Sequence, residues 1–304
     1  MIASRLAAGP ISWGVCEVPG WGLQLPPADV LAQMHALGIR ATEAGPDGYL
    51  GTDAAGVRRL LEEHELQLVG GFLPLVLHDP EQLPASLAKA ATTARLFGEL
   101  GASVINTAAV VDDAWSAPIA LSEREWAHLL DSLPQVDAVV RRHGLTQALP
   151  PHWGTLVERD DDVRRVVEGS DVGICLDTGH LSLGGTDGLA LAHEVPGRIA
   201  HVHLKDVDDE VARLLRAGEL SLVAAVAEGL FQPLGNGDAP VAQVVLALEE
   251  AGYDSWYVLE QDTALAAGDE ATRSRPFEDV QRSIEFLTTL APDDAAVASA
   301  GEGR

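Results

Sequence analysis

The chain has 304 residues, of which 47% are hydrophobic and 22% charged, and its formal net charge is −26. This composition is typical of a folded globular protein and excludes a fibrous or wholly disordered chain. So large a negative charge repels nucleic acids and anionic membranes, so we expect neither as a partner. No apolar run reaches the roughly 18 residues that a membrane-spanning helix needs.

The N-terminal segment MIASRLAAGPISWG lacks the apolar core and the cleavage site of a signal peptide, so we interpret it as a first strand. The two cysteines, Cys16 and Cys175, both stand in apolar runs. This placement predicts reduced core residues in a cytoplasmic protein and gives no support to a zinc–thiolate site.

Short β-rich runs alternate with longer helical patterns along the chain. The expected strands are residues 7–13, 41–44, 66–73, 103–107, 146–150, 172–177, 199–204 and 256–260. The clearest helices are expected over residues 27–37, 84–100 and 126–142. Several strands are apolar almost throughout, as in VGICLD and YVLE, which is expected where helices cover both faces of a parallel sheet.

Eight such β-then-α units predict parallel strands with right-handed crossovers, and a closed (β/α)8 TIM barrel forming one domain over residues 1–290. Residues 208–237 are too long for a simple connection and predict one or two helices over the mouth of the barrel. Residues 291–304 are rich in Ala, Asp and Gly without periodicity, so we expect a disordered tail.

Functional residues of such barrels lie at the carboxyl ends of the strands. Here the sixth strand ends at Asp177, the seventh presents His201 and His203 on one face, and the eighth ends at Glu260. Buried carboxylates and imidazoles must be paired or coordinated. A mixed set without thiolate suits Mn²⁺, Co²⁺, Mg²⁺, Fe²⁺ or Zn²⁺. The sequence therefore predicts a divalent metal on the barrel axis.

Other polar residues near strand ends have two interpretations each. Glu43 either binds sugar hydroxyls or caps the turn at Gly45. Lys205 faces the same side as His203, so it either donates a proton or stabilises an alkoxide, or else it forms an ion pair with Asp206 or Glu260. Trp13, Trp21 and Trp153 could form apolar walls for a sugar ring or pack in the core.

Seven phrases carry a resemblance to a known family. They are GPISWGVCEVPGWG, TEAGPDGYL, PPHWGTLVE, CLDTGHLSLGGTD, HVHLKDV, FQPLGNGD and WYVLEQD. The chain resembles the inosose-dehydratase-like branch of the xylose-isomerase-like TIM-barrel sugar isomerases and epimerases, from about residue 7 to residue 290.

The resemblance implies a metal held at the ends of strands five to eight, with Asp177, His203 and Glu260 at three ligand positions. Relatives carry Glu or His at the end of strand five, where this chain has Pro150, so either His152 or Glu158 takes that place, with a slight preference for His152. His180 matches a substrate-binding or acid–base histidine of the family.

The implied reaction is the metal-dependent dehydration of a keto-polyol such as 2-keto-myo-inositol (inosose), with Mn²⁺ or Co²⁺ favoured. We assign catalysis to Glu158, His180 and Lys205, substrate binding to Trp13, Glu43, Trp153 and His201, and metal binding to His152, Asp177, His203 and Glu260. The alternatives are a ketose 3-epimerase or aldose–ketose isomerase, a C-glycoside-cleaving lyase subunit, and a metal-free sugar-binding scaffold. Barrels of this kind often form homodimers.

Overall fold

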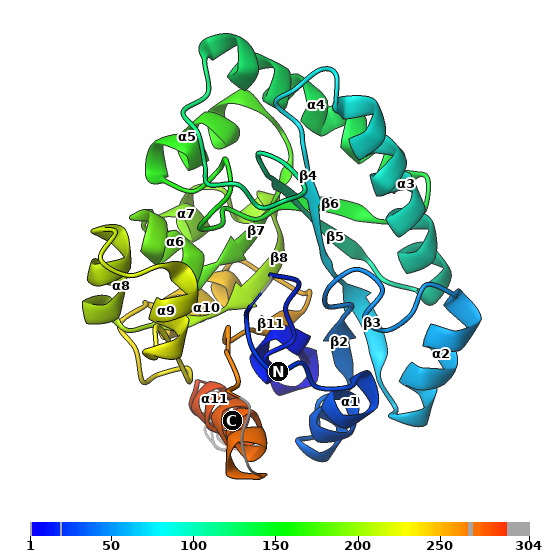
Figure 1. The fold of residues 1–304 in the computed structure, drawn as a ribbon, viewed down its shortest axis with the longest axis vertical. Coiled ribbons are helices and arrows are strands. Elements are labelled where there is room, and N and C mark those ends of the chain that lie inside the picture. The colour runs from blue at the N-terminus through cyan, green and yellow to red at the C-terminus, as the bar shows by residue number, and fades with distance from the viewer. Residues whose placement is uncertain (1, 19, 267–269, 291–304) are drawn as a thin grey trace, which may run out of the picture.

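Eight parallel strands surrounded by helices form a barrel in the computed structural model, which describes residues 2–18, 20–266 and 270–290 (Figure 1). The strands are β1 (Leu6–Ala8), β2 (Ala41–Glu43), β3 (Gln67–Gly70) with β4 (Phe72–Leu75), β5 (Val104–Ala109), β6 (Thr146–Leu149), β7 (Gly173–Asp177), β8 (Ile199–Leu204) and β11 (Tyr257–Leu259). They follow the order β3-β2-β1-β11-β8-β7-β6-β5-β4. The predicted fold class is confirmed, while the predicted disordered tail, residues 291–304, lies outside the described residues.

The third strand of the barrel is bent, and the bend closes the sheet. Gly71 separates β3, which pairs with β2, from β4, which pairs with β5. A Cβ atom on Gly70 would lie 2.9 Å from the carbonyl oxygen of Val104, and one on Gly71 would lie 2.8 Å from the Phe97 ring. Only glycine fits where the neighbouring strand and helix come so close.

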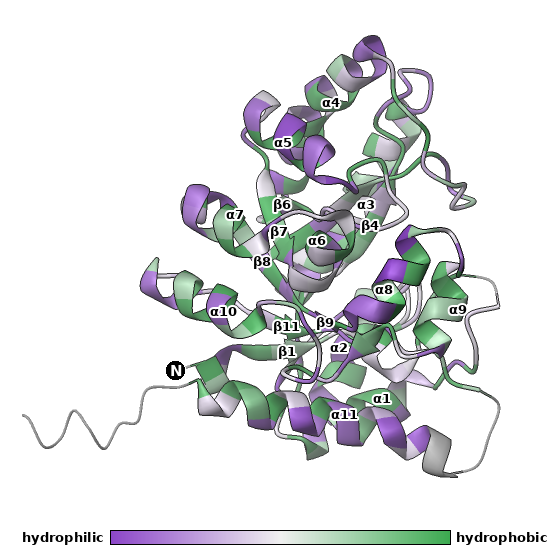
Figure 2. Cartoon of the chain, turned by 90° about the vertical axis from the view of Figure 1, so that its left-hand side faces the viewer, coloured by the Kyte–Doolittle hydropathy of each residue, from purple (hydrophilic) through white to green (hydrophobic). Residues whose placement is uncertain are grey.

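Helices cover the outside of the barrel, and their inner faces complete its core. They are α1 (Pro27–Ala36), α2 (Ala54–Glu63), α3 (Leu83–Leu100), α4 (Glu123–Arg141), α5 (Asp160–Gly169), α6 (Thr178–Gly184), α7 (Gly188–Glu194), α8 (Asp209–Arg216), α9 (Leu222–Ala227), α10 (Val241–Glu250) and α11 (Glu270–Thr289). Within α4, Trp126, Leu129, Leu133, Val136 and Val140 recur every three to four residues and are all buried. Figure 2 shows many hydrophilic residues in α5 and α8, whose buried residues are apolar, as at Val163 and Leu215. Among the described residues, none of the helices combines the length and the apolarity of a membrane span.

Two expectations near the N-terminus are wrong. Residues 10–13 form a 3-10 helix, η2 (Pro10–Trp13), instead of continuing the first strand. Pro10 cannot donate to a strand ladder, and Gly14, at φ +80°, turns the chain after this short helix. Cys16 is partly exposed and not a core residue, whereas Cys175 is buried as predicted, and both thiols are free.

The connection over the barrel mouth contains the two helices expected there. The antiparallel strands β9 (Asp206–Val207) and β10 (Phe231–Gln232) enclose α8 and α9. Asp206 holds the following loop together, because its carboxylate accepts from the backbone N–H groups of Gly235, Gly237 and Ala239. This contact explains the LGNGD phrase as a structural loop.

Candidate metal centre and active site

Three donor side chains meet where β7, β8 and β11 end. Nδ1 of His203 lies 3.1 Å from Oε2 of Glu260 and 3.6 Å from Oδ2 of Asp177. The donor atoms of this group all lie within 4.8 Å of one another, and Asp177 and His203 are buried. The structure therefore brings together three of the four residues that were predicted as metal ligands, Asp177, His203 and Glu260.

Asp177 uses its two carboxylate oxygens differently. Oδ1 accepts from the backbone N–H groups of Gly179 and His180 and so caps α6. Oδ2 is buried, has no hydrogen bond, and faces His203 and Lys205. Burial would raise the pKa of Asp177, but Lys205, His180 and His203 hold that pKa well below its usual value. Oδ2 of Asp177 is ionised, accepts no hydrogen bond and lies beside the ligand atoms of His203 and Glu260. These three residues therefore fit a divalent cation.

Lys205 brings an ammonium group into the same place. Its Nζ lies 2.9 Å from Glu260, 3.0 Å from Asp262 and 3.3 Å from Asp177. Burial would lower the pKa of Lys205, but these three carboxylates raise it well above its usual value. Nζ is also 3.0 Å from Nε2 of His180. Lys205 is thus a protonated side chain in direct contact with two of the predicted metal ligands.

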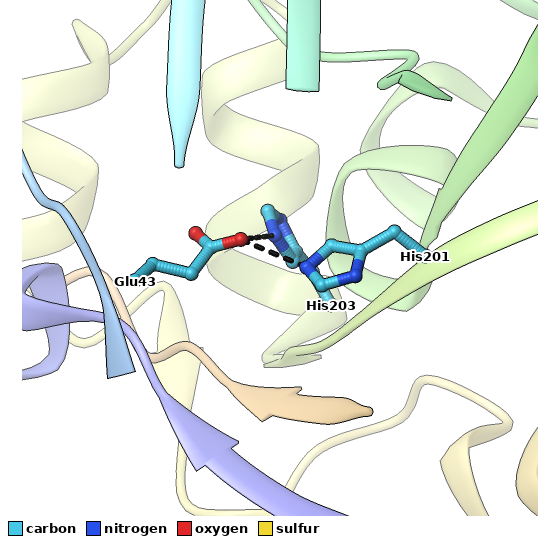
Figure 3. A group of neighbouring side chains, drawn as sticks. All are labelled: Glu43, His201 and His203. Carbon is cyan, nitrogen blue, oxygen red and sulfur yellow. Dashed lines mark hydrogen bonds and ion pairs between the residues drawn. The ribbon is translucent and has the colours of Figure 1, made fainter. Parts of the chain in front are cut away.

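A second buried group lies on the other side of His203 (Figure 3). Oε1 of Glu43 accepts from Nε2 of His201 at 2.8 Å, from Nδ2 of Asn106 at 2.9 Å and from Nε2 of His203 at 3.2 Å. Burial would raise the pKa of Glu43, but the two histidines lower it far below its usual value. His203 in turn has a pKa well above its usual value, because Cys175, Glu260 and Glu43 outweigh the effect of burial.

Neither of the two residues predicted to supply the strand-five ligand, His152 and Glu158, belongs to the group of donor atoms that lie within 4.8 Å of one another. Nδ1 of His152 is 2.8 Å from the carbonyl oxygen of Trp153, and its ring lies against that of His180, tilted by 34° with 3.6 Å between centroids. Oε2 of Glu158 accepts from the backbone N–H of Gly154 at 2.7 Å. Burial lowers the pKa of His152 to about 4 and raises that of Glu158. Pro150 follows β6 directly and is buried.

A cavity of about 640 Å³ opens over these groups. Its polar lining residues include Glu43, His152, His203, Lys205, Glu260 and Asp262. Trp21 and Trp153 line it as well. Trp13 instead lies in the core, where its indole N–H donates to Gln33. His180 and His201 are fully buried and contact the lining residues Lys205 and Glu43, but they do not line the cavity themselves. The cavity is large enough for a cyclic polyol.

Sequence reasoning missed two residues of the site. Asp262 stands two residues after Glu260, within the WYVLEQD phrase, and burial raises its pKa to about 6. Asn106 is a polar residue within the apolar strand β5 and is fully buried. The amide of Asn106 could have been recognised from the sequence, because a polar side chain in a strand expected to be buried requires a hydrogen-bond partner.

The fold and the site define a (β/α)8 barrel with a carboxylate–imidazole centre at the carboxyl ends of its strands. The chain belongs to the xylose isomerase-like TIM barrel family, whose sequence profile matches residues 31–290. It is 31% identical to the rhizopine catabolism protein MocC of Rhizobium meliloti, over 86% of this chain and 82% of that protein. It is also 30% identical to an inosose dehydratase of Geobacillus kaustophilus, over 86% and 89% of the two chains.

Solved structures share the fold at low identity. An L-ribulose 3-epimerase superposes with a TM-score of 0.69 at 14% identity, over 99% of this chain and 98% of that one. The IOLI protein with a bound zinc atom superposes with a TM-score of 0.67 at 17% identity, over 94% and 97%. The predicted family and the predicted resemblance to inosose dehydratases are confirmed by these comparisons.

Proposed function

We propose that the protein is a metal-dependent hydro-lyase that removes water from a keto-polyol of the inosose type. The observation that carries this proposal is the group of Asp177, His203 and Glu260, whose donor atoms converge below a polyol-sized cavity beside the ammonium of Lys205. The identity of about 30% with an inosose dehydratase supports the same reaction and substrate class.

The ligand set favours a divalent ion of intermediate hardness. Two carboxylates and one imidazole without a thiolate suit Mn²⁺ or Co²⁺, and also accept Mg²⁺, Fe²⁺ or Zn²⁺. Pro150 offers no donor, so three protein ligands leave room for substrate oxygens. When bound, such an ion acts as a Lewis acid that makes the C–H beside the substrate carbonyl more acidic.

His152 is suited to remove that proton. A backbone carbonyl only accepts hydrogen bonds, so Nδ1 of His152 carries the ring hydrogen and Nε2 keeps its lone pair. With a pKa of about 4 the ring is neutral near pH 7. His152 is partly exposed and lines the cavity. We therefore assign it the role of general base in place of metal ligand.

Lys205 is suited to assist the departure of the hydroxyl group. The leaving oxygen must gain a proton to depart as water, and the Lys205 ammonium carries one at the floor of the cavity. His180 lies behind Lys205, with its Nε2 3.0 Å from Nζ, and so supports the lysine without touching the cavity. Glu158 is bonded to the Gly154 N–H, and we assign it to shaping the loop after β6.

Deuterium labelling tests this proposal. Protein freed of metal with EDTA, then supplied with Mn²⁺ or Co²⁺, is incubated with 2-keto-myo-inositol in D₂O and followed by NMR. We expect a dehydrated product only when metal is present. Deuterium incorporation at the carbon beside the carbonyl without a dehydrated product would instead indicate an epimerase. If the protein produces no dehydrated product and incorporates no deuterium, both reactions are refuted.

A further inference from the structure

One carboxylate oxygen, Oε1 of Glu43, gathers three hydrogen-bond donors from the barrel interior. Asn106 on β5 supplies one donor, and His201 and His203 on β8 supply the other two, which Figure 3 shows with Glu43. Every residue of this group is at most 3% exposed. We propose that Glu43 is a positioning residue, which fixes the ring of His203 so that Nδ1 faces the metal. This inference rests on the metal site of the proposed function and deepens it.

The hydrogen bond from His203 to Glu43 determines which ring nitrogen holds the proton. An ionised carboxylate only accepts, so Nε2 of His203, at 3.2 Å from Glu43, keeps its proton when a metal ion takes the place of the proton on Nδ1. The lone pair then belongs to Nδ1, which lies 3.1 Å from Glu260 and 3.6 Å from Asp177. Three acceptor atoms are thereby directed at one point, as a metal site requires. Carboxylates that orient a ligating histidine in this way raise metal affinity in other proteins.

His201 and Asn106 hold Glu43 itself in place. His201 donates to the same oxygen at 2.8 Å, and its ring stands edge-on to that of His203, at 77° and 5.2 Å. Asn106 Nδ2 lies 2.9 Å from Glu43 and 3.3 Å from Nε2 of His203. With three donors on one oxygen, the carboxylate cannot rotate without losing several buried hydrogen bonds.

The three hydrogen-bond donors around Glu43 also argue that no second cation binds there. The nearest ligand atoms of Glu43, His201 and His203 lie within 4.8 Å of one another, close enough to hold an ion. However, the amide N–H of Asn106 points at the same oxygen, and a cation there would face that donor. The group is therefore a hydrogen-bonded support for His203. We assign this supporting role to Glu43 and His201 in place of the substrate binding that the sequence predicted for them.

The test combines Zn²⁺ titration with NMR of the histidine rings. Wild-type protein labelled with ¹⁵N-histidine is freed of metal and titrated with Zn²⁺, and the His203 signals are assigned with the variant H203Q. We expect one equivalent of Zn²⁺, a proton on Nε2 of His203 and Zn²⁺ on Nδ1. Glu43→Gln should weaken Zn²⁺ binding about 10- to 100-fold and allow the proton to move to Nδ1, while Glu43→Asp, which keeps the charge, should recover part of the affinity.

Glu249→Gln is the matched control, since Glu249 accepts from Tyr257 at 2.8 Å and pairs with Arg5 near the start of β1, away from the cavity. It should leave the Zn²⁺ affinity within about twofold. A proton on Nδ1 of His203 in the Zn²⁺-bound wild type overturns the inference, whether or not the variants fold. Two equivalents of Zn²⁺, with one lost in Glu43→Gln, would also overturn it. Wild-type protein that binds no Zn²⁺ refutes the metal site of the proposed function instead, and the ring signals then decide separately whether Glu43 holds the Nε2 proton.

Discussion

Lys205 is the residue whose replacement should separate metal binding from stability. Its ammonium group neutralises the buried carboxylates of Asp177 and Glu260. The same positive charge repels a metal ion bound by these two carboxylates. Removing one partner of a buried ion pair costs about 3–5 kcal/mol. Lys205→Met should therefore lower the melting temperature of the metal-free protein, tighten Mn²⁺ binding at least about tenfold, and abolish dehydration. Calorimetric titration with Mn²⁺ and thermal unfolding with and without the ion measure both effects.

Lys89 provides the matched control for this change. It also lines the cavity, but its ion pair with Asp113 is exposed, and exposed pairs contribute only about 0–1 kcal/mol. Lys89→Met should leave Mn²⁺ affinity unchanged. Weaker Mn²⁺ binding in Lys205→Met would contradict the view that the lysine competes with the metal.

His152 should matter for the chemical step and little for metal binding. His152 lines the cavity, and its Nδ1 contacts the Trp153 carbonyl at 2.8 Å, which leaves Nε2 as the basic nitrogen of the neutral ring. Replacing it with Asn should lower kcat about 10²- to 10⁴-fold, the range that one general base contributes. Mn²⁺ affinity should stay within about threefold. A loss of metal binding in His152→Asn would instead restore the earlier interpretation of His152 as a ligand.

At the level of single residues, the sequence predicted the three donors because each ends an apolar strand. The sequence also offered an ion pair between Lys205 and Glu260 as one alternative, and the structure contains it. It could not predict that Lys205 would contact Asp177 as well, because that contact depends on the close approach of α6 to β8. A Cβ atom on Gly179 would lie 2.5 Å from the Cβ of Lys205, so the glycine of CLDTGH makes this approach possible. The contacts of His152 could not be predicted for a similar reason, since the loop after β6 sets its backbone and ring contacts.

At the level of elements, the alternation of strands and helices was predictable because each element has its own period. The expected strand 199–204 matches β8, and the expected helix 27–37 matches α1 to within one residue. The incorrect strand predictions have local causes that hydrophobic periodicity does not reveal. Pro10 and Gly14 impose a 3-10 turn after β1, and the Gly70–Gly71 pair bends the third strand into β3 and β4.

The bend in the third strand gives a prediction about folding. A methyl group on Gly70 would press on the backbone oxygen of Val104, which cannot rotate away as a side chain could. Gly70→Ala should destabilise the protein by about 1–3 kcal/mol, the usual cost of forcing an extra carbon into a packed core. Urea unfolding measures it. Gly197→Ala, where a Cβ meets nothing within 4 Å, should be nearly neutral, and equal effects of the two variants would contradict the steric explanation.

At the level of the whole molecule, acidic residues far outnumber basic ones. The chain has 46 acidic and 20 basic residues, so even complete pairing of every basic side chain would leave 26 acidic groups unpaired. Most ion pairs of the described residues are partly or fully exposed, as in Arg165–Glu123 and Arg95–Glu99, and each stabilises the fold only slightly. Repulsion among the remaining carboxylates therefore outweighs surface pairing.

This imbalance predicts that salt stabilises the protein. Raising NaCl from 20 to 500 mM shortens the screening length to a few ångströms and weakens repulsion between distant carboxylates more than contacts within pairs. With EDTA present at pH 8, the melting temperature should rise by about 2–4 °C, which corresponds to about 1 kcal/mol. The rise should shrink as the pH is lowered to 5.5, towards the sequence pI of about 4.5, because the net charge shrinks. A melting temperature that falls with salt at pH 8 would mean that surface ion pairs, and not the excess of carboxylates, dominate the electrostatic free energy of the fold.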